Sequence, residues 1–303
     1  MSGPIDLSQL SPPTVVETLD FDSLFSDMLN TLKEYAPTVA EGISDSDPAW
    51  KILQVAAYRE LLVRQRVNEA AKSVMLAYAQ GSDLDHLGAL FGTQRLEVMP
   101  SDSNTLPSTS ATNESDDEYR RRIQLSLEGF SVAGPEGAYR YHAMSADGQV
   151  LDASATSPSP GEVVITVLSR RDDGSADSNL IKKVYDAVNS EKVRPLTDAV
   201  TVRSARIVPY TITARLYCYE GPDSTVVLES ARKSVSLFAQ EQHFLGRSIT
   251  RSGLYAALHQ PGVQRVELLE PAALAQGQEE IEIDVLSAGH CTQISLNLGG
   301  IHG

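Results

Sequence analysis

Basic residues are few in this chain of 303 residues, and the shortage is greatest near its N-terminus. The chain has 25 Lys and Arg against 40 Asp and Glu, which gives a formal net charge of -15, and Lys33 is the only basic residue among the first fifty. An acidic surface repels phosphate backbones and anionic lipid headgroups. We therefore expect neither nucleic acid nor a membrane surface as a partner.

Cysteines and long apolar runs are also scarce. The two cysteines, Cys218 and Cys291, are too few for a disulfide framework and favour reduced thiols in a cytoplasm. No apolar run approaches the ~20 residues that span a bilayer. The start, MSGPIDLSQLSPP, lacks the basic and apolar segments of a secretory signal. These features favour a protein made in a reducing cytoplasm.

Motifs that carry chemistry are missing as well. The stretch GFSVA at 129–133 is one residue short of the G-x-S-x-G nucleophile elbow, and it follows a predicted helix where that motif needs a strand. His290 and Cys291 are adjacent, which rarely suits one tetrahedral metal ion, and no C-x-x-C or H-E-x-x-H motif accompanies them. We predict no catalytic residue, no metal ligand and no cofactor.

Helical periodicity dominates the first hundred residues. Apolar residues from Phe21 to Leu32 recur at helical spacing, and Pro37 should end that helix. Asp47 is a good N-cap, Pro48 suits the first helical position, and Gly81 is the next residue that breaks the pattern. This predicts a helix over 47–80, about 50 Å long at 1.5 Å per residue. A compact sphere made from the whole chain would be about as wide, so we expect the helix to project.

Small and apolar residues gather on one side of the later part of this helix. Such residues let a neighbouring helix approach closely. The alternative is an ordinary helical hairpin within one chain. On the first interpretation, the predicted interface set is Leu62, Val63, Val67, Ala70, Ala71, Val74 and Tyr78.

Two further helices are predicted by their caps. Ser82, with Asp85 three residues later, should begin a short helix that ends at Gly92. A second capping box, Ser115 with Glu118, should begin a helix that turns three residues inward, Tyr119, Ile123 and Leu127. The run Arg120–Arg122 lies among acidic residues, which favours a solvated face of paired charges over a phosphate site.

The periodicity changes to that of a mixed fold after residue 162. Strands are predicted at 163–169, 199–204, 210–219 and 262–269, and helices at 178–189 and 225–242. The order β-α-β-β-α-β matches the split βαβ, ferredoxin-like plan, with two helices on one face of a mainly antiparallel sheet. A further strand is predicted at 292–299. The predicted class is α+β, a helical N-terminal region followed by mixed modules.

Five separated blocks resemble the phage baseplate assembly protein J family, in the same order. One is AYRELLVRQRVNEAAKSVMLAYAQGSDLDHLGALFGTQRL at 57–96, another is VRPLTDAVTV at 193–202, and the others are at 119–169, 212–224 and 243–268. The resemblance covers roughly residues 1 to 270. It implies a baseplate wedge protein of a contractile phage tail or of an R-type pyocin, located in the virion after assembly in the bacterial host cytoplasm.

The same resemblance implies the partners. In this family, two J-like chains join one smaller helical wedge protein through a three-helix core bundle. The C-terminal parts pair with each other and link wedges into a ring, whose opening triggers sheath contraction. Sheath-initiator, hub-side and fibre proteins are further implied partners. A tail-associated cell-wall hydrolase and a host-binding module are the alternative functions.

These patterns together predict the organisation of the chain. The boundaries are a helical wedge-core region at 1–98, a linker at 99–113, a helical and hairpin middle region at 114–161, an α/β dimerisation domain at 162–270, and a C-terminal strand and tail at 271–303.

Overall fold

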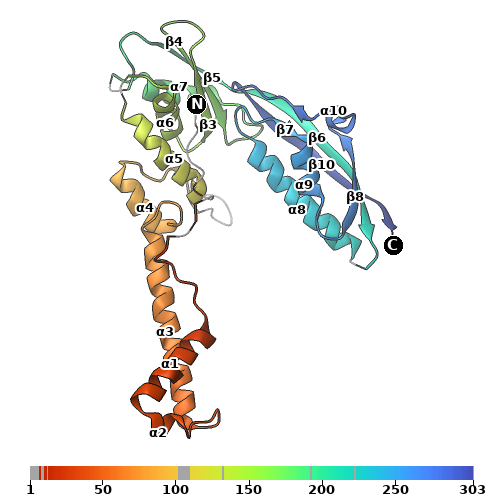
Figure 1. Cartoon of the computed structure of the whole chain (residues 1–303). Helices are drawn as coiled ribbons and strands as arrows, with labels where there is room; N and C mark the ends of the chain where they lie inside the picture. The colour runs from red at the N-terminus through yellow and green to blue at the C-terminus, as the bar shows by residue number, and fades with distance from the viewer. Residues whose placement is uncertain are drawn as a thin grey trace. The chain divides into compact units, whose positions relative to one another are not determined.

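The computed structural model describes residues 10–11, 13–101, 110–131, 133–191, 193–221 and 223–302, together with Leu7 (Figure 1). The chain divides into two compact units, Met1–Gln94 with Ser115–Ile123, and Arg95–Glu114 with Gln124–Gly303. Helices and strands both occur, the strands in several small sheets. The predicted α+β class is confirmed.

The first unit is helical. In helix α1, Phe21–Tyr35, the backbone N–H of Ser23 donates to the carboxylate of Asp20 at 2.8 Å. Helix α2, Pro37–Ala40, follows directly, so Pro37 ends one helix, as predicted, and begins the next.

Helix α3, Pro48–Ser73, starts where the sequence predicts and ends earlier. The Asp47 carboxylate accepts the backbone N–H of Ala49 at 2.9 Å, and Pro48 occupies the first turn. The helix has 26 residues, which corresponds to about 39 Å. The predicted extension to Gln80 is wrong.

A side chain from a distant helix ends α3. The Arg120 guanidinium donates to the carbonyl oxygens of Leu76 at 2.7 Å and Ala79 at 2.8 Å, 44 and 41 residues away along the chain. These carbonyls accept a charged donor where a continuing helix would use later N–H groups. Local periodicity carries no information about so distant a partner.

Helix α4, Gly81–Leu90, begins without the predicted cap. Its N-cap is Gln80, which makes no side-chain cap bond, and the proposed start at Ser82 is wrong. The Asp116 carboxylate, far away in sequence, accepts the Gly81 N–H at 3.1 Å, so one of the first unsatisfied donors needs no local cap. The predicted stop is confirmed, since Gly92 has φ +65° just after the helix.

Helix α5, Asp116–Gly129, contains the predicted capping box. Ser115 N donates to Glu118 Oε2 at 3.1 Å, and Glu118 N donates to Ser115 Oγ at 3.4 Å. Tyr119 and Ile123 are buried with residues from α4 and the segment before it. Leu127 is exposed and Leu125 is buried, so that part of the inward face is wrong. Beyond Ile123 the helix packs on another element: Gly129 lies against Tyr141.

The arginine run is not the solvated face that was predicted. Arg122 is buried and donates to the carbonyl of Gln94, and only 14% of the Arg120 side chain is exposed. Arg120 pairs with Asp117 at 2.6 Å while it holds the carbonyls after α3. Two of the three arginines therefore brace backbone, because their guanidinium groups supply several donors to buried carbonyls.

In the second unit, the central module, residues 136–204, contains a three-stranded sheet. Strand β3, Val150–Thr156, is antiparallel to β4, Glu162–Ser169, and β4 is parallel to β5, Ala199–Ser204. Helices α6, Glu136–Ser145, and α7, Ser178–Val188, share one apolar core with this sheet. Short strands β1, Glu97–Met99, and β2, Thr112–Asn113, pair with each other.

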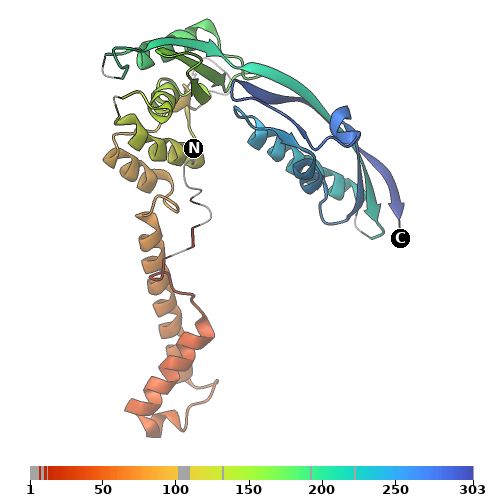
Figure 2. The same cartoon turned by 45° about the horizontal axis from the view of Figure 1, so that its top comes forward.

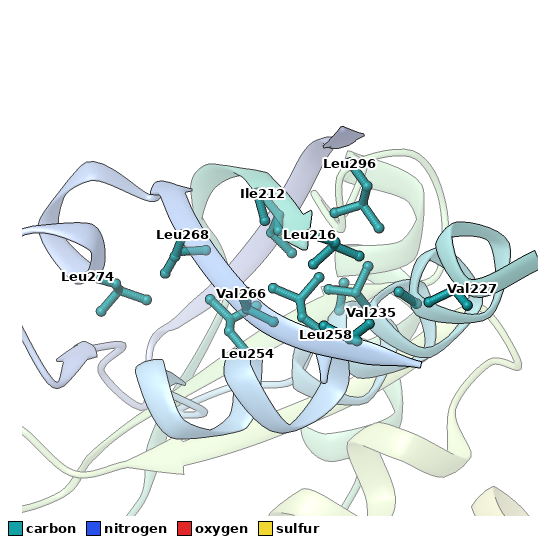
Figure 3. Close-up of a cluster of buried hydrophobic side chains, with 14 of the residues drawn as sticks. Ile212, Leu216, Val227, Val235, Leu254, Leu258, Val266, Leu268, Leu274 and Leu296 are labelled. Atoms are coloured by element: carbon teal, nitrogen blue, oxygen red, sulfur yellow. The ribbon is translucent and has the colours of Figure 1, made fainter. Parts of the chain in front are cut away.

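The C-terminal module, residues 206–302, has a second three-stranded sheet. Strand β6, Arg206–Tyr219, lies between the parallel β10, Ser287–His302, and the antiparallel β8, Val263–Glu270 (Figure 2). Helices α8, Ser224–Gln242, and α9, Arg251–Leu258, pack on it, and their leucines and valines meet those of the strands (Figure 3). The remaining elements are β7 Ile249–Thr250, α10 Ala272–Ala275 and β9 Glu280–Ile281.

The single ferredoxin-like sheet is wrong, although its six elements exist in the predicted order. Strands β5 and β6 belong to different sheets, and the C-terminal β10 occupies the edge of β6 that a single sheet would give to a neighbour. Strand order along a chain does not specify which edges pair when an additional strand competes for one of them.

The predicted domain boundaries stay predictions. Residues 102–109 of the predicted linker at 99–113 lie outside the described residues. Among the helices that the structure describes, none combines the length and apolar character needed to cross a bilayer.

Candidate assembly surface

Helix α3 is covered on one side by the segment that precedes it. The ribbon of α1 runs beside α3 (Figure 1). Ala57 is completely buried there, and the rings of Phe25 and Trp50 meet edge to face at 4.9 Å between centroids. The helix α1 and the chain before it therefore occupy one face of α3.

Polar contacts hold the leading segment on that face. The Asn68 side-chain amide donates to the carbonyl of Glu17 at 2.8 Å and accepts the N–H of Glu17 at 3.0 Å. Arg64 pairs with Glu60 at 2.6 Å and with Glu17 at 3.2 Å. The hydrogen bond to Glu60 contributes most to raising the pKa of Arg64, and the bond to Glu17 raises it further. The Tyr78 hydroxyl donates to the carbonyl of Leu10 at 2.8 Å. These contacts fix which face of α3 stays open.

The open face of α3 carries apolar side chains at helical spacing. Members three, four or seven residues apart lie along one stripe. Its large members are strongly exposed: Ile52 68%, Val63 61% and Val67 53% on the helix, and Val74 68% at the C-cap position just after it. The exposed alanines Ala56 and Ala70 lie between them. We call the six residues Ile52, Ala56, Val63, Val67, Ala70 and Val74 the α3 stripe.

The predicted interface set divides between this stripe and its surroundings. Four of its members, Val63, Val67, Ala70 and Val74, belong to the stripe. Leu62 is 39% exposed and lies toward Val55 and Tyr58, which form a second exposed apolar group on α3. Ala71 is half-buried, and Tyr78 makes the bond to Leu10 within the chain. Whether these seven residues contact a partner stays a prediction.

Two residues of the stripe lie outside the predicted interface set. Ile52 and Ala56 precede Val63 by 11 and 7 residues, so they continue the same face through three turns of helix. Their spacing is visible in the sequence, but the predicted interface set begins at Leu62. Contiguous exposed apolar side chains of this kind mark an interaction site in soluble proteins.

Apolar side chains are also exposed where strands β6 and β10 of the C-terminal sheet end. Tyr219, Leu298 and Ile301 are 50%, 42% and 54% exposed, and Ile301 pairs in register with Cys218 next to Tyr219. Leu298 and Ile301 on β10 pair with Leu216 and Cys218, so they lie on the same face of the sheet as these buried residues, whereas Tyr219 on β6 lies on the opposite face.

The residues with side chains that could suit catalysis or metal binding make contacts within the fold. His290 meets the ring of His243, whose Nδ1 lies 2.7 Å from the carbonyl oxygen of Gly289. The thiol of Cys291 donates to the carbonyl of Gln293 at 3.5 Å, and burial raises its pKa. Gly129 packs closely under Tyr141, and Val132 of the same stretch lies outside the described residues. Among the described residues, no group of three or more His, Cys, Asp and Glu could hold a metal ion.

Comparison with known proteins places these features in a family. Residues 45–102 match the baseplate J-like N-terminal domain, and residues 131–204 match the baseplate J-like central domain. Baseplate protein J of Escherichia phage P2 is 49% identical over 302 residues, which cover 98% of each chain. The chain belongs to the baseplate J-like family. The resemblance read from the sequence is confirmed.

The family domains can be located on the fold of this J-like chain. The α3 stripe lies within the N-terminal family domain, and the central domain ends at Ser204, the last residue of β5. A chain of the anti-feeding prophage baseplate, solved by cryo-EM, aligns with a TM-score of 0.39 and 12% sequence identity. The alignment covers 63% of this chain and 43% of the prophage chain. A TM-score below 0.5 does not establish a shared fold.

Proposed function

We propose that this chain is a structural wedge protein in the baseplate of a contractile phage tail or tail-like particle, and that it assembles through the α3 stripe. The observation that carries the proposal is the open apolar face of α3 in a member of the baseplate J-like family. The chain resides in the virion after assembly in the bacterial host cytoplasm, and it acts by binding, without catalysis.

The shape and chemistry of the stripe favour a helical partner. A straight row of valines, alanines and isoleucine at helical spacing fits the apolar face of another helix, and the alanines let the two backbones come close. The partners are a second copy of this chain and the smaller helical wedge protein, joined in a three-helix bundle. The exposed side chains of Leu298 and Ile301 on β10 support pairing between C-terminal modules that links wedges into a ring.

Membership of the family supports a wider role. The ring surrounds the central spike and contacts sheath-initiator or hub-side and fibre proteins, and its opening triggers sheath contraction. Each contact would bury surfaces that are exposed in the isolated chain.

The proposal is tested by placing a charge in the stripe. In Val67→Glu and Ala70→Glu, a carboxylate would be buried without a partner in the bundle, at a cost of about 3–5 kcal/mol. Each substitution should weaken binding of the small wedge protein by at least a hundredfold. Isothermal titration of the purified chain with that protein measures the loss.

A matched variant separates assembly from folding. Gln65 is exposed on α3 away from the stripe, so Gln65→Glu adds the same charge on the same helix and should bind like the wild type. Because Val67 and Ala70 are exposed in the single chain, their variants should keep its helical circular dichroism. Wild-type affinity in both stripe variants would rule out the stripe as the contact.

A further inference from the structure

The central and C-terminal modules are joined by a single residue. Strand β5 ends at Ser204 and β6 begins at Arg206. The residue between them, Ala205, is buried, and its N–H donates to the carbonyl of Val167 on β4 at 2.8 Å. The connection therefore continues the hydrogen-bond ladder of the central sheet and has no slack that could serve as a hinge.

A buried carboxylate lies at this joint. Asp152, on β3 of the central module, is 3% exposed. It accepts hydrogen bonds from Arg140 at 2.9 Å and from the backbone N–H of Ala153 at 2.9 Å, both in its own module. Its other oxygen, Oδ2, accepts the N–H of Leu245 from the C-terminal module at 3.2 Å. A buried charge is tolerated only with such partners, so separation of the modules would deprive it of one donor.

Close apolar packing surrounds the carboxylate. Leu168 of β4 and Ala288 of β10 are completely buried and form one cluster with Ala205. Gly174, at φ +100°, is seated against the C-terminal module: a Cβ there would lie 2.7 Å from Leu168 Cδ1 and 2.9 Å from His243 Nε2. Interiors packed this tightly resist relative motion.

A further bond holds the outer edge. The Ser154 hydroxyl donates to the carbonyl of Val285 at 2.7 Å, two residues along β3 from Asp152. The joint is thus tied at the strand connection, at Asp152 and at the sheet edge.

We infer that the central and C-terminal modules move as one rigid body, and that Asp152 is the residue whose hydrogen bonds hold them together. Any rearrangement of the baseplate that displaces the C-terminal module would then carry the central module with it. The inference concerns the joint alone and holds or fails independently of the proposed function.

Distances between spin labels, measured by double electron–electron resonance, test whether the joint is rigid. One label is placed on α7 with Lys182→Cys and one on α8 with Lys233→Cys, both exposed positions, in a Cys291→Ser background that leaves only the buried Cys218. A reference pair, Glu136→Cys with Lys182→Cys, lies within the central module. The distance distribution across the joint should be as narrow as that of the reference pair. A distribution more than twice as wide in the wild type would overturn the inference.

The role of Asp152 is tested with Asp152→Ala in the same labelled chain. It should at least double the width across the joint and leave the reference pair unchanged. Asp147→Ala is the matched control, because Asp147 is also largely covered but pairs with Lys183 inside the central module, at 2.6 Å. An unchanged width in Asp152→Ala, or equal widening in both variants, would remove Asp152 from this role.

Hydrogen exchange gives a second readout, whose first part uses the unsubstituted chain and so does not depend on variant folding. The peptide containing Leu245 should exchange as slowly as peptides from β4, because its N–H is held by a buried carboxylate. Loss of that bond in Asp152→Ala should speed the exchange about ten- to a hundredfold. Rapid exchange at Leu245 in the wild type would contradict the role of Asp152 in holding the modules together.

Discussion

Adding one methyl group at Gly88 should destabilise the helical unit strongly. Gly88 lies on α4, and a Cβ there would be 1.9 Å from the Tyr119 hydroxyl oxygen and 2.9 Å from the carbonyl oxygen of Thr93. These two oxygens are themselves joined by a hydrogen bond of 2.7 Å. The methyl of Gly88→Ala must therefore displace a buried tyrosine from its acceptor.

The expected cost has two parts. Loss of the Tyr119–Thr93 hydrogen bond removes about 1 kcal/mol, and forced repacking of a filled core costs about 1–3 kcal/mol. The free energy of unfolding should fall by about 2–4 kcal/mol in total. Urea denaturation followed by far-ultraviolet circular dichroism measures the change, and hydrogen exchange over 81–92 assigns it to α4.

Two variants check the reasoning. Gly42→Ala is the control, because the nearest atom to its Cβ would be 4.0 Å away, and it should change stability by less than about 1 kcal/mol. Tyr119→Phe removes the oxygen nearest to the new methyl, so its effect combined with Gly88→Ala should be smaller than the sum of the two. A Gly88→Ala protein as stable as Gly42→Ala, or strict additivity, would refute the account of this core.

Two further predictions concern charged groups. Arg120→Ala should lower the free energy of unfolding by about 2–3 kcal/mol, since the carbonyls of Leu76 and Ala79 lose a charged donor. Urea denaturation measures this change. A loss below about 0.5 kcal/mol would show that the two hydrogen bonds from Arg120 do not stabilise the fold. At Asp147, burial acts to raise the carboxyl pKa, but bonds from Lys183 and Gln149 outweigh it and the folded pKa is lowered. Its stabilisation is therefore present above pH ~4 and lost as the pH falls through the depressed folded pKa. Asp147→Asn should flatten the stability profile there, and an unaltered profile would show that another group controls it.

Local signals in the sequence predicted the starts of α3 and α5, but not that of α4. The Asp47–Pro48 start and the Ser115–Glu118 box depend on residues within one turn, so the sequence contains all that they need. The end of α3 depends on Arg120, more than forty residues away, and the burial of Arg122 depends on the position of Gln94. Such partners are set by tertiary packing, which periodicity does not encode.

The same distinction applies to sheets and surfaces. Strands β4, β5, β6 and β8 and the middle of β10 were predicted from alternating or apolar runs, whereas β3, β7 and β9 were not. The choice of β10 over β5 as the neighbour of β6 is a competition between distant edges. Helical spacing identified Val63, Val67 and Val74 as one face. The position of Tyr78 depends on its bond to Leu10 in the leading segment, which no pattern within the helix predicts.

The most direct test of the wedge proposal is the mass in solution of this chain alone and co-expressed with the small wedge protein of the same particle. Multi-angle light scattering should find a stable complex of two copies of this chain with one small wedge protein, and Val67→Glu should leave the two proteins separate. A wild-type chain that stays monomeric beside the small wedge protein would contradict the account.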